Sequence, residues 1–145
     1  MCSFFLSINM IGQVQEIPWQ AELTRINGAE YFDGQDKNDI GKDFIGGVIM
    51  IDFSVSRVYV VGNTTNFFIL KVIDRMTKME EEVLQKTGIG SNIYKCDRQG
   101  IEWKLDLQYD SAENTVHTSF YFNGDDGILK VISFESKPIP KETAE

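Results

Sequence analysis

Cys96 and His117 are the two side chains of this sequence that could form a nucleophile–base pair. His117 is the only histidine, and the second cysteine, Cys2, lies far away near the start of the chain. A catalytic cysteine needs a base within reach and a setting that lowers the pKa of its thiol, such as a helix start. Both residues fall in segments that resemble strands, and no glycine-rich elbow adjoins Cys96. We therefore expect an inert strand cysteine and a protein that is not an enzyme.

The polar loop at residues 33–43 contains the hard oxygen ligands that calcium prefers. If it is aligned as an EF-hand beginning at Asp36, Ile40 occupies the fifth position and Gly47 the twelfth, where an oxygen ligand and a bidentate glutamate are needed. Zinc would require more cysteine and histidine than the chain contains. Neither a P-loop nor a G-x-G-x-x-G motif occurs. The sequence therefore predicts no metal and no cofactor.

The composition is that of one acidic globular domain. The chain has 145 residues, 42% of them hydrophobic, which is enough to bury a core without disulfides or metals. Its formal charge is −8, from 22 acidic and 14 basic residues. Such a charge repels phosphate backbones and anionic lipids and speeds encounters with basic partners, although it also serves solubility alone. The basic residues are scattered, so direct nucleic-acid binding is not expected.

A cytoplasmic location is expected from the N-terminus and the cysteine content. Residues 1–10 are apolar, but the first cationic side chain is Arg25, so the basic region of a signal peptide is missing. No apolar stretch approaches the length of a membrane span. Two cysteines are too few for a disulfide framework, which favours a reducing compartment. Met1 and Met10 remain alternative start sites.

The first third of the chain is expected to form strands and one loop. Strands are expected at residues 3–14, 21–26 and 30–32. The dipeptide Asn27-Gly28 favours a two-residue hairpin between the last two of them. Residues 33–43 are polar and contain glycine, so we expect an exposed loop there.

Two short apolar runs, at residues 48–51 and 58–61, lack the alternation of a half-exposed strand. Strands of this kind are usually buried on both faces, so both runs are expected to lie centrally in a sheet. Gly46 and Gly47, just before the first run, indicate a bulge or a close backbone approach.

A long helix is expected at about residues 65–87. Apolar residues recur there at spacings of three and four, Thr65 can cap the start, and Gly88 suits the left-handed stop. The competing interpretation is a strand over residues 66–73 followed by a shorter helix.

The last third is expected to form an antiparallel meander. Residues 101–109 alternate strictly between apolar and polar, and similar segments follow at residues 116–122 and 128–134. The predicted architecture is therefore α+β: a curved antiparallel sheet of about six to eight strands, with one long helix packed across it. Residues 1–136 would form a single domain, and residues 137–145 an extended or disordered tail.

Carboxylates gather in expected turns and on one expected helix face, some of them beside aromatic residues. The candidate partner-binding residues are Tyr31, Phe32, Asp33, Asp36, Asp39, Asp43, Glu80, Glu81, Asp110 and Glu113. Each group alone could be a solvated turn or helix face. Together they would suit a surface that meets the lysines and arginines of a basic protein, with aromatic residues supplying affinity.

The leading hypothesis is therefore a protein-binding inhibitor, an immunity protein that neutralises a basic bacterial toxin of the nuclease type by covering its active or substrate-binding surface. Immunity proteins against colicin-like toxins are similar in size and charge and in lacking catalytic motifs. One alternative is a phage-type inhibitor of a host defence protein. The other is a small-molecule binding domain with a pocket between helix and sheet, lined by Phe68, Met76, Trp103 and Phe120. The oligomeric state is left open.

Overall fold

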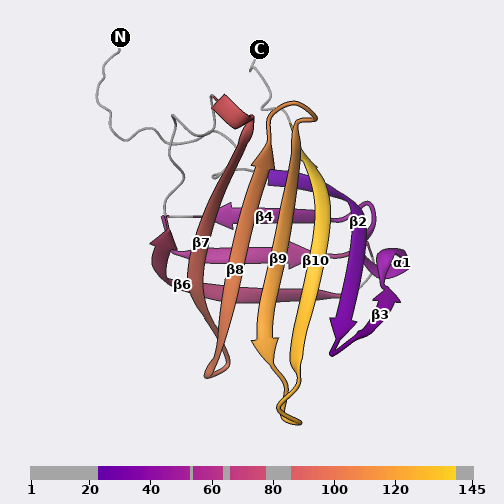
Figure 1. Ribbon diagram of the computed structural model, residues 1–145, viewed down its shortest axis with the longest axis vertical. Helices are drawn as coiled ribbons and strands as arrows, with labels where there is room; N and C mark the ends of the chain where they lie inside the picture. The colour runs from indigo at the N-terminus through magenta and orange to yellow at the C-terminus, as the bar shows by residue number, and fades with distance from the viewer. Residues whose placement is uncertain (1–22, 53, 64–65, 78–85, 140–145) are drawn as a thin grey trace.

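The strands of this chain, whose side chains alternate between two faces, build an antiparallel β-barrel (Figure 1). The structure is a computed structural model that describes residues 23–52, 54–63, 66–77 and 86–139. Its elements are β2 (Leu23–Asp33), β3 (Asp36–Asp39), α1 (Gly41–Phe44), β4 (Val48–Asp52), β5 (Arg57–Val61), β6 (Phe67–Thr77), β7 (Ile89–Arg98), β8 (Ile101–Asp110), β9 (Thr115–Asn123) and β10 (Leu129–Pro138).

The barrel closes because β10 pairs with β2 as well as with β9. The described strands follow the order β10-β9-β8-β7-β6-β5-β4-β2-β3, and the additional pairing of β10 with β2 joins the two sides. Without β3, which lies outside the ring along β2, eight of the nine described strands form the closed barrel. In Figure 1, β4, β5 and β6 run crosswise behind β7 to β10, so the barrel is flattened into two crossing layers.

The interior between these layers is filled by aromatic side chains. The Phe68 ring meets the Phe120 ring edge-on with centroids 5.3 Å apart, and Phe44 of α1 meets Phe134 in the same way, also at 5.3 Å. Trp103 lies 5.8 Å from Phe68. Such edge-to-face pairs add to the hydrophobic free energy of burial. The core is therefore a packed aromatic cluster.

The predicted long helix is wrong, and with it the α+β class. Residues 67–77 form β6, which pairs with β5 and β7, while residues 78–85 lie outside the described residues. Phe68 and Leu70 are buried, whereas Phe67 and Ile69, each of which precedes one of them, are exposed. Apolar residues on both faces of this strand imitate helical spacing, and its β-branched residues favour a strand. The competing interpretation of a strand at 66–73 was closer.

The predicted hairpin at Asn27-Gly28 is also wrong, because β2 continues through it. Ile26 pairs with Ser136 and Gly28 with Glu135, which leaves Asn27 as an extra residue in a β-bulge. The chain reverses later, at Gly34, whose φ of +68° suits glycine. The expected loop at 33–43 is accordingly partly regular, since it contains β3 and α1.

Within the described residues, β4 and β5 are covered on one face only, and not on both as the sequence predicted. Ile49 and Val60 point into the barrel, but Met50 and Val61 on the outer face are 40% and 42% exposed. The predicted close approach at Gly47 is confirmed: a Cβ atom there would collide with the Val61 carbonyl oxygen. The first predicted strand, residues 3–14, lies outside the described residues.

The meander of the last third is confirmed as β8, β9 and β10. Strict alternation predicted these strands because one face of each meets the core. β10 is longer than expected: Lys137 and Pro138, assigned to the tail, still pair with Arg25 and Thr24 of β2. These last pairs lengthen the contact that closes the barrel.

Replacing Leu105 by alanine should test the core. Leu105 is fully buried in β8, so we expect Leu105→Ala to lower the free energy of unfolding by about 2–5 kcal/mol. Leu129→Ala is the matched control, because Leu129 is 51% exposed and should lose less than about 0.5 kcal/mol. Urea denaturation measures both. Equal losses in the two variants would contradict this core.

Candidate functional site: the acidic edge at β3

The strand β3 is the exposed edge of the sheet. It pairs with β2 from Glu30–Asp39 to Asp33–Asp36, and no described strand pairs with its other side. All four of its residues are exposed. Figure 1 shows β3 at the side of the barrel, leading into α1. The free side of β3 therefore presents unpaired backbone groups to solvent.

Asp36 and Asp39 lie on this strand and Asp43 lies in the helix α1 that follows it, and we call the three carboxylates the acidic edge. Among the described residues, no Lys or Arg nitrogen lies within ion-pairing distance of any of them. Asp39 Oδ1 accepts the backbone N–H of Gly41 at 2.8 Å, which fixes the start of α1. Lys37, the cation of β3, is paired with Glu30 at 2.9 Å. Within the described ranges, ion pairs therefore do not neutralise the acidic edge.

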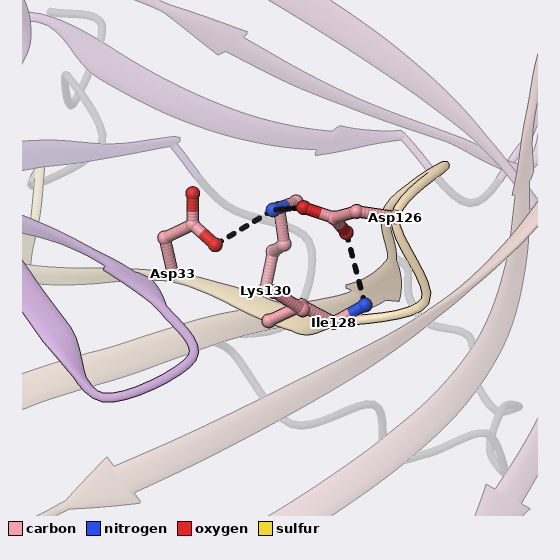
Figure 2. Close-up of polar contacts among 4 residues, drawn as sticks. All are labelled: Asp33, Asp126, Ile128 and Lys130. Atoms are coloured by element: carbon pink, nitrogen blue, oxygen red, sulfur yellow. Dashed lines mark hydrogen bonds and ion pairs between the residues drawn. The ribbon is translucent and has the colours of Figure 1, made fainter.

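Asp33, one turn earlier, is neutralised by a lysine from the other end of the chain (Figure 2). Lys130 Nζ donates to Asp33 Oδ1 at 2.7 Å and to Asp126 Oδ2 at 3.2 Å. Asp126 Oδ1 accepts the N–H of Ile128 at 2.9 Å. The pKa of Lys130 is raised, mainly by its hydrogen bond to Asp33. The pKa of Asp126 is lowered, first by the hydrogen bond from the N–H of Ile128 and second by the hydrogen bond from Lys130. Asp33 therefore holds β2 to the β9–β10 turn.

The two candidate aromatic residues lie on opposite faces of β2. Tyr31 is opposite Ile132, which packs against the core, whereas Phe32 is opposite Val131 on one side and Lys37 of β3 on the other. Both rings are half-buried. Of the two, Phe32 is the one placed beside the outer face of the acidic edge.

The remaining candidates do not join this site. Asp110 and Glu113 lie in the β8–β9 turn at the other end of the barrel (Figure 1), where Asp110 Oδ1 accepts the N–H of Ala112. Glu80 and Glu81 lie outside the described residues. Lys130 and Asp126 were not among the candidate residues predicted from the sequence. No local pattern could reveal Lys130, because it stands 97 positions from Asp33.

The Cys96 thiol and the His117 ring face different environments. Cys96 points into the barrel and is 1% exposed, and burial raises the pKa of its thiol to about 12. His117 is exposed on the outer face of β9, with β8 between the two strands. The two side chains are therefore not a nucleophile–base pair. Across the described residues, no three His, Cys, Asp or Glu side chains converge as metal ligands do.

The predicted pocket between helix and sheet depended on the long helix, and the structure has the strand β6 at residues 67–77 instead. Phe68, Trp103 and Phe120 pack on one another inside the barrel, and Met76 is 57% exposed. A groove of about 410 Å³ does open on the outside of β8 to β10. Its lining residues are Glu102, Lys104, Tyr121, Phe122, Asn123 and Leu129.

Comparison of the chain with family models, with curated proteins and with solved structures found no match. None of the helical segments in the described ranges has the length and apolar character needed to cross a membrane.

Replacing Lys130 by glutamine should raise the pKa of Asp126. The N–H of Ile128 would remain, so the pKa should stay below its ordinary value of 3.8. A carboxyl group whose pKa is lower in the folded chain than in the unfolded chain stabilises the fold at pH values above its unfolded pKa. That stabilisation is lost as the pH falls through the pKa of the folded state. We therefore expect Lys130→Gln to be less stable than the wild type at neutral pH and to lose less of its stability on acidification.

Carboxyl-carbon NMR titration measures the pKa, and thermal melts across the acid range measure stability. Lys95→Gln is the control, because Lys95 and Glu102 form only a loose, exposed pair at 3.9 Å. An unchanged pKa of Asp126 in Lys130→Gln would show that Lys130 does not pair with Asp126 in solution.

The Cys96 thiol should resist modification in the native protein. In a Cys2→Ser background, a thiol-specific disulfide reagent at mildly alkaline pH should react with Cys96 only at the rate of unfolding, because burial leaves almost no thiolate. Adding urea should restore a reaction rate typical of a free thiol. Fast labelling of the native protein would mean that Cys96 is accessible and reactive.

Proposed function

We propose that the protein binds a basic protein through β3 and inhibits it. The observation that carries this proposal concerns β3, an edge strand that pairs with β2 on one side and with no described strand on the other. Its two carboxylates have no cationic partner among the described residues. Two kinds of interaction become available at the same place, namely backbone hydrogen bonds and charge.

An edge strand can accept a further strand from another protein through main-chain hydrogen bonds. Charged residues normally protect such an edge, because two like-charged strands repel one another. Asp36 and Asp39 would therefore repel a second copy of the acidic chain, whereas a strand rich in lysine or arginine would be attracted. The edge is selective for a basic partner.

Affinity would come from apolar contact next to the charges. Phe32 lies on β2 beside β3, half-buried and flanked by Val131. Aromatic anchors of this kind supply most of the binding energy at protein interfaces, while surrounding charges set the association rate.

The class of partner follows from the charge of the edge. Nucleases hold phosphates with lysine and arginine, and carboxylates on a rigid edge can occupy the same cations and keep the nucleic acid out. We accordingly propose a nuclease-type toxin as the target and an immunity protein as the role. Support comes from the overall charge of −8 and from the position of the acidic edge.

A triple variant should test the edge. Asp36→Asn, Asp39→Asn and Asp43→Asn change the charge from −8 to −5, since −8 + 3 = −5. Asparagine Oδ1 can still accept the N–H of Gly41, so α1 should keep its start. We expect the variant to lose capture of a basic partner from the native host and to associate with it at least about tenfold more slowly at low salt.

The matched control neutralises three exposed acids elsewhere, with the same change of net charge: Asp74→Asn, Glu102→Gln and Glu135→Gln. This control variant should still capture the basic partner and should associate with it only slightly more slowly than the wild type. Capture is measured by cross-linking and mass spectrometry. If both triple variants bind alike, the acidic edge is the wrong surface. If the captured partner is a nuclease whose activity the protein leaves unchanged, binding stands and inhibition fails.

A further inference from the structure

The outer face of β4, β5 and β6 is apolar over two adjacent rows of paired residues. One row is formed by Leu23, Met50, Tyr59 and Ile69, and the next by Val48, Val61 and Phe67. We call these seven residues the apolar face. Phe67 is 63% exposed, although it is a large aromatic residue. A charged row of Asp52, Arg57, Lys71 and Asp97 marks one border of the face, and Arg25 of β2, which pairs with Val48, lies at another.

This surface explains the lack of alternation in two of its strands. Strands 48–51 and 58–61 carry apolar residues on consecutive positions, as strands covered on both sides do. The barrel core covers Ile49 and Val60 on the inside, and the described residues leave Met50 and Val61 uncovered on the outside. Soluble proteins seldom expose a contiguous apolar patch of this kind without an occupant.

We infer that residues 1–22 of the same chain dock on the apolar face. The described chain begins at Leu23, which is itself one of the seven residues and pairs with Met50. Whatever precedes Leu23 is therefore attached at the border of this surface. Twelve of the 22 residues are apolar and two are charged, Glu16 and Glu22.

The length of the segment is sufficient and its attachment favours it over a second copy. Twenty-two residues can extend over about 70 Å, whereas three adjacent strands span only about 10 Å between the outer two. A tethered segment also acts at an effective concentration in the millimolar range, far above that of another molecule. Burying the face in this way would keep the barrel from associating through it.

The chain carries its own site for a probe. Of the two cysteines, Cys2 lies in the segment, and Cys96 is buried with its pKa raised to about 12. A thiol-reactive nitroxide therefore labels the full-length protein at Cys2. Its paramagnetic effect on backbone amides reports which surface the segment visits.

Amides of β4, β5 and β6 should lose most of their NMR intensity when the nitroxide is present, and those of the outer faces of β8 and β9 should keep theirs. The loss should not change on dilution. A mixture of isotope-labelled Cys2→Ser protein with unlabelled, nitroxide-carrying protein should show no loss. Intact amides in β4 to β6 would overturn the inference, and losses in the mixture would assign the face to a second copy instead.

Two charge substitutions complete the test. Phe67→Glu places a carboxylate in the apolar face and should restore the amide intensities, while the barrel stays folded because Phe67 is exposed. Leu129→Glu is the control, since Leu129 is also exposed, at 51%, but belongs to β10 outside the apolar face. Equal behaviour of the two variants would show that the segment does not recognise this face.

Discussion

The pairing of β10 with β2 is the constraint on which the rest of this molecule depends. These strands lie at the two ends of the described chain and pair over nearly their whole length, from Lys130–Asp33 to Pro138–Thr24. Their contact turns an open sheet into a barrel and encloses the aromatic cluster. It also brings Lys130 between Asp33 and Asp126, so two ion pairs stabilise one end of the pairing between β10 and β2. Pairing across such a separation is entropically costly and slow to form.

Closure determines where function can lie. The interior is occupied by interlocking rings of Phe44, Phe68, Trp103, Phe120 and Phe134, so the side chains that could act on other molecules are on the outside. A closed ring also removes edges, and among the described strands β3 lies outside the ring with one side unpaired along its whole length. That is why the acidic edge stands out from the other carboxylates of an acidic protein.

The acidic edge and the apolar face have opposite physical characters, and each calls for a different occupant. The first is charged, exposed and lined with backbone groups that can still form hydrogen bonds, which suits a basic partner from outside. The second is uncharged and begins where residues 1–22 join the barrel, which suits a segment of the same chain. The two proposals stand independently, because they rest on different strands and their tests change different residues.

Local patterns in the sequence determined the acidity, the three strands of the last third and the close approach at Gly47. Each of these depends on composition or on neighbours in the chain. The tertiary structure alone decided that residues 67–77 form a strand, because apolar residues on both faces satisfy helical and extended spacing equally, and only pairing with β5 and β7 separates them. Only the tertiary structure shows that Asp33 forms an ion pair with Lys130, 97 positions away, and that Asp36 forms none with the described residues. Both outcomes follow from closure of the barrel, which brings together residues that no sequence window contains.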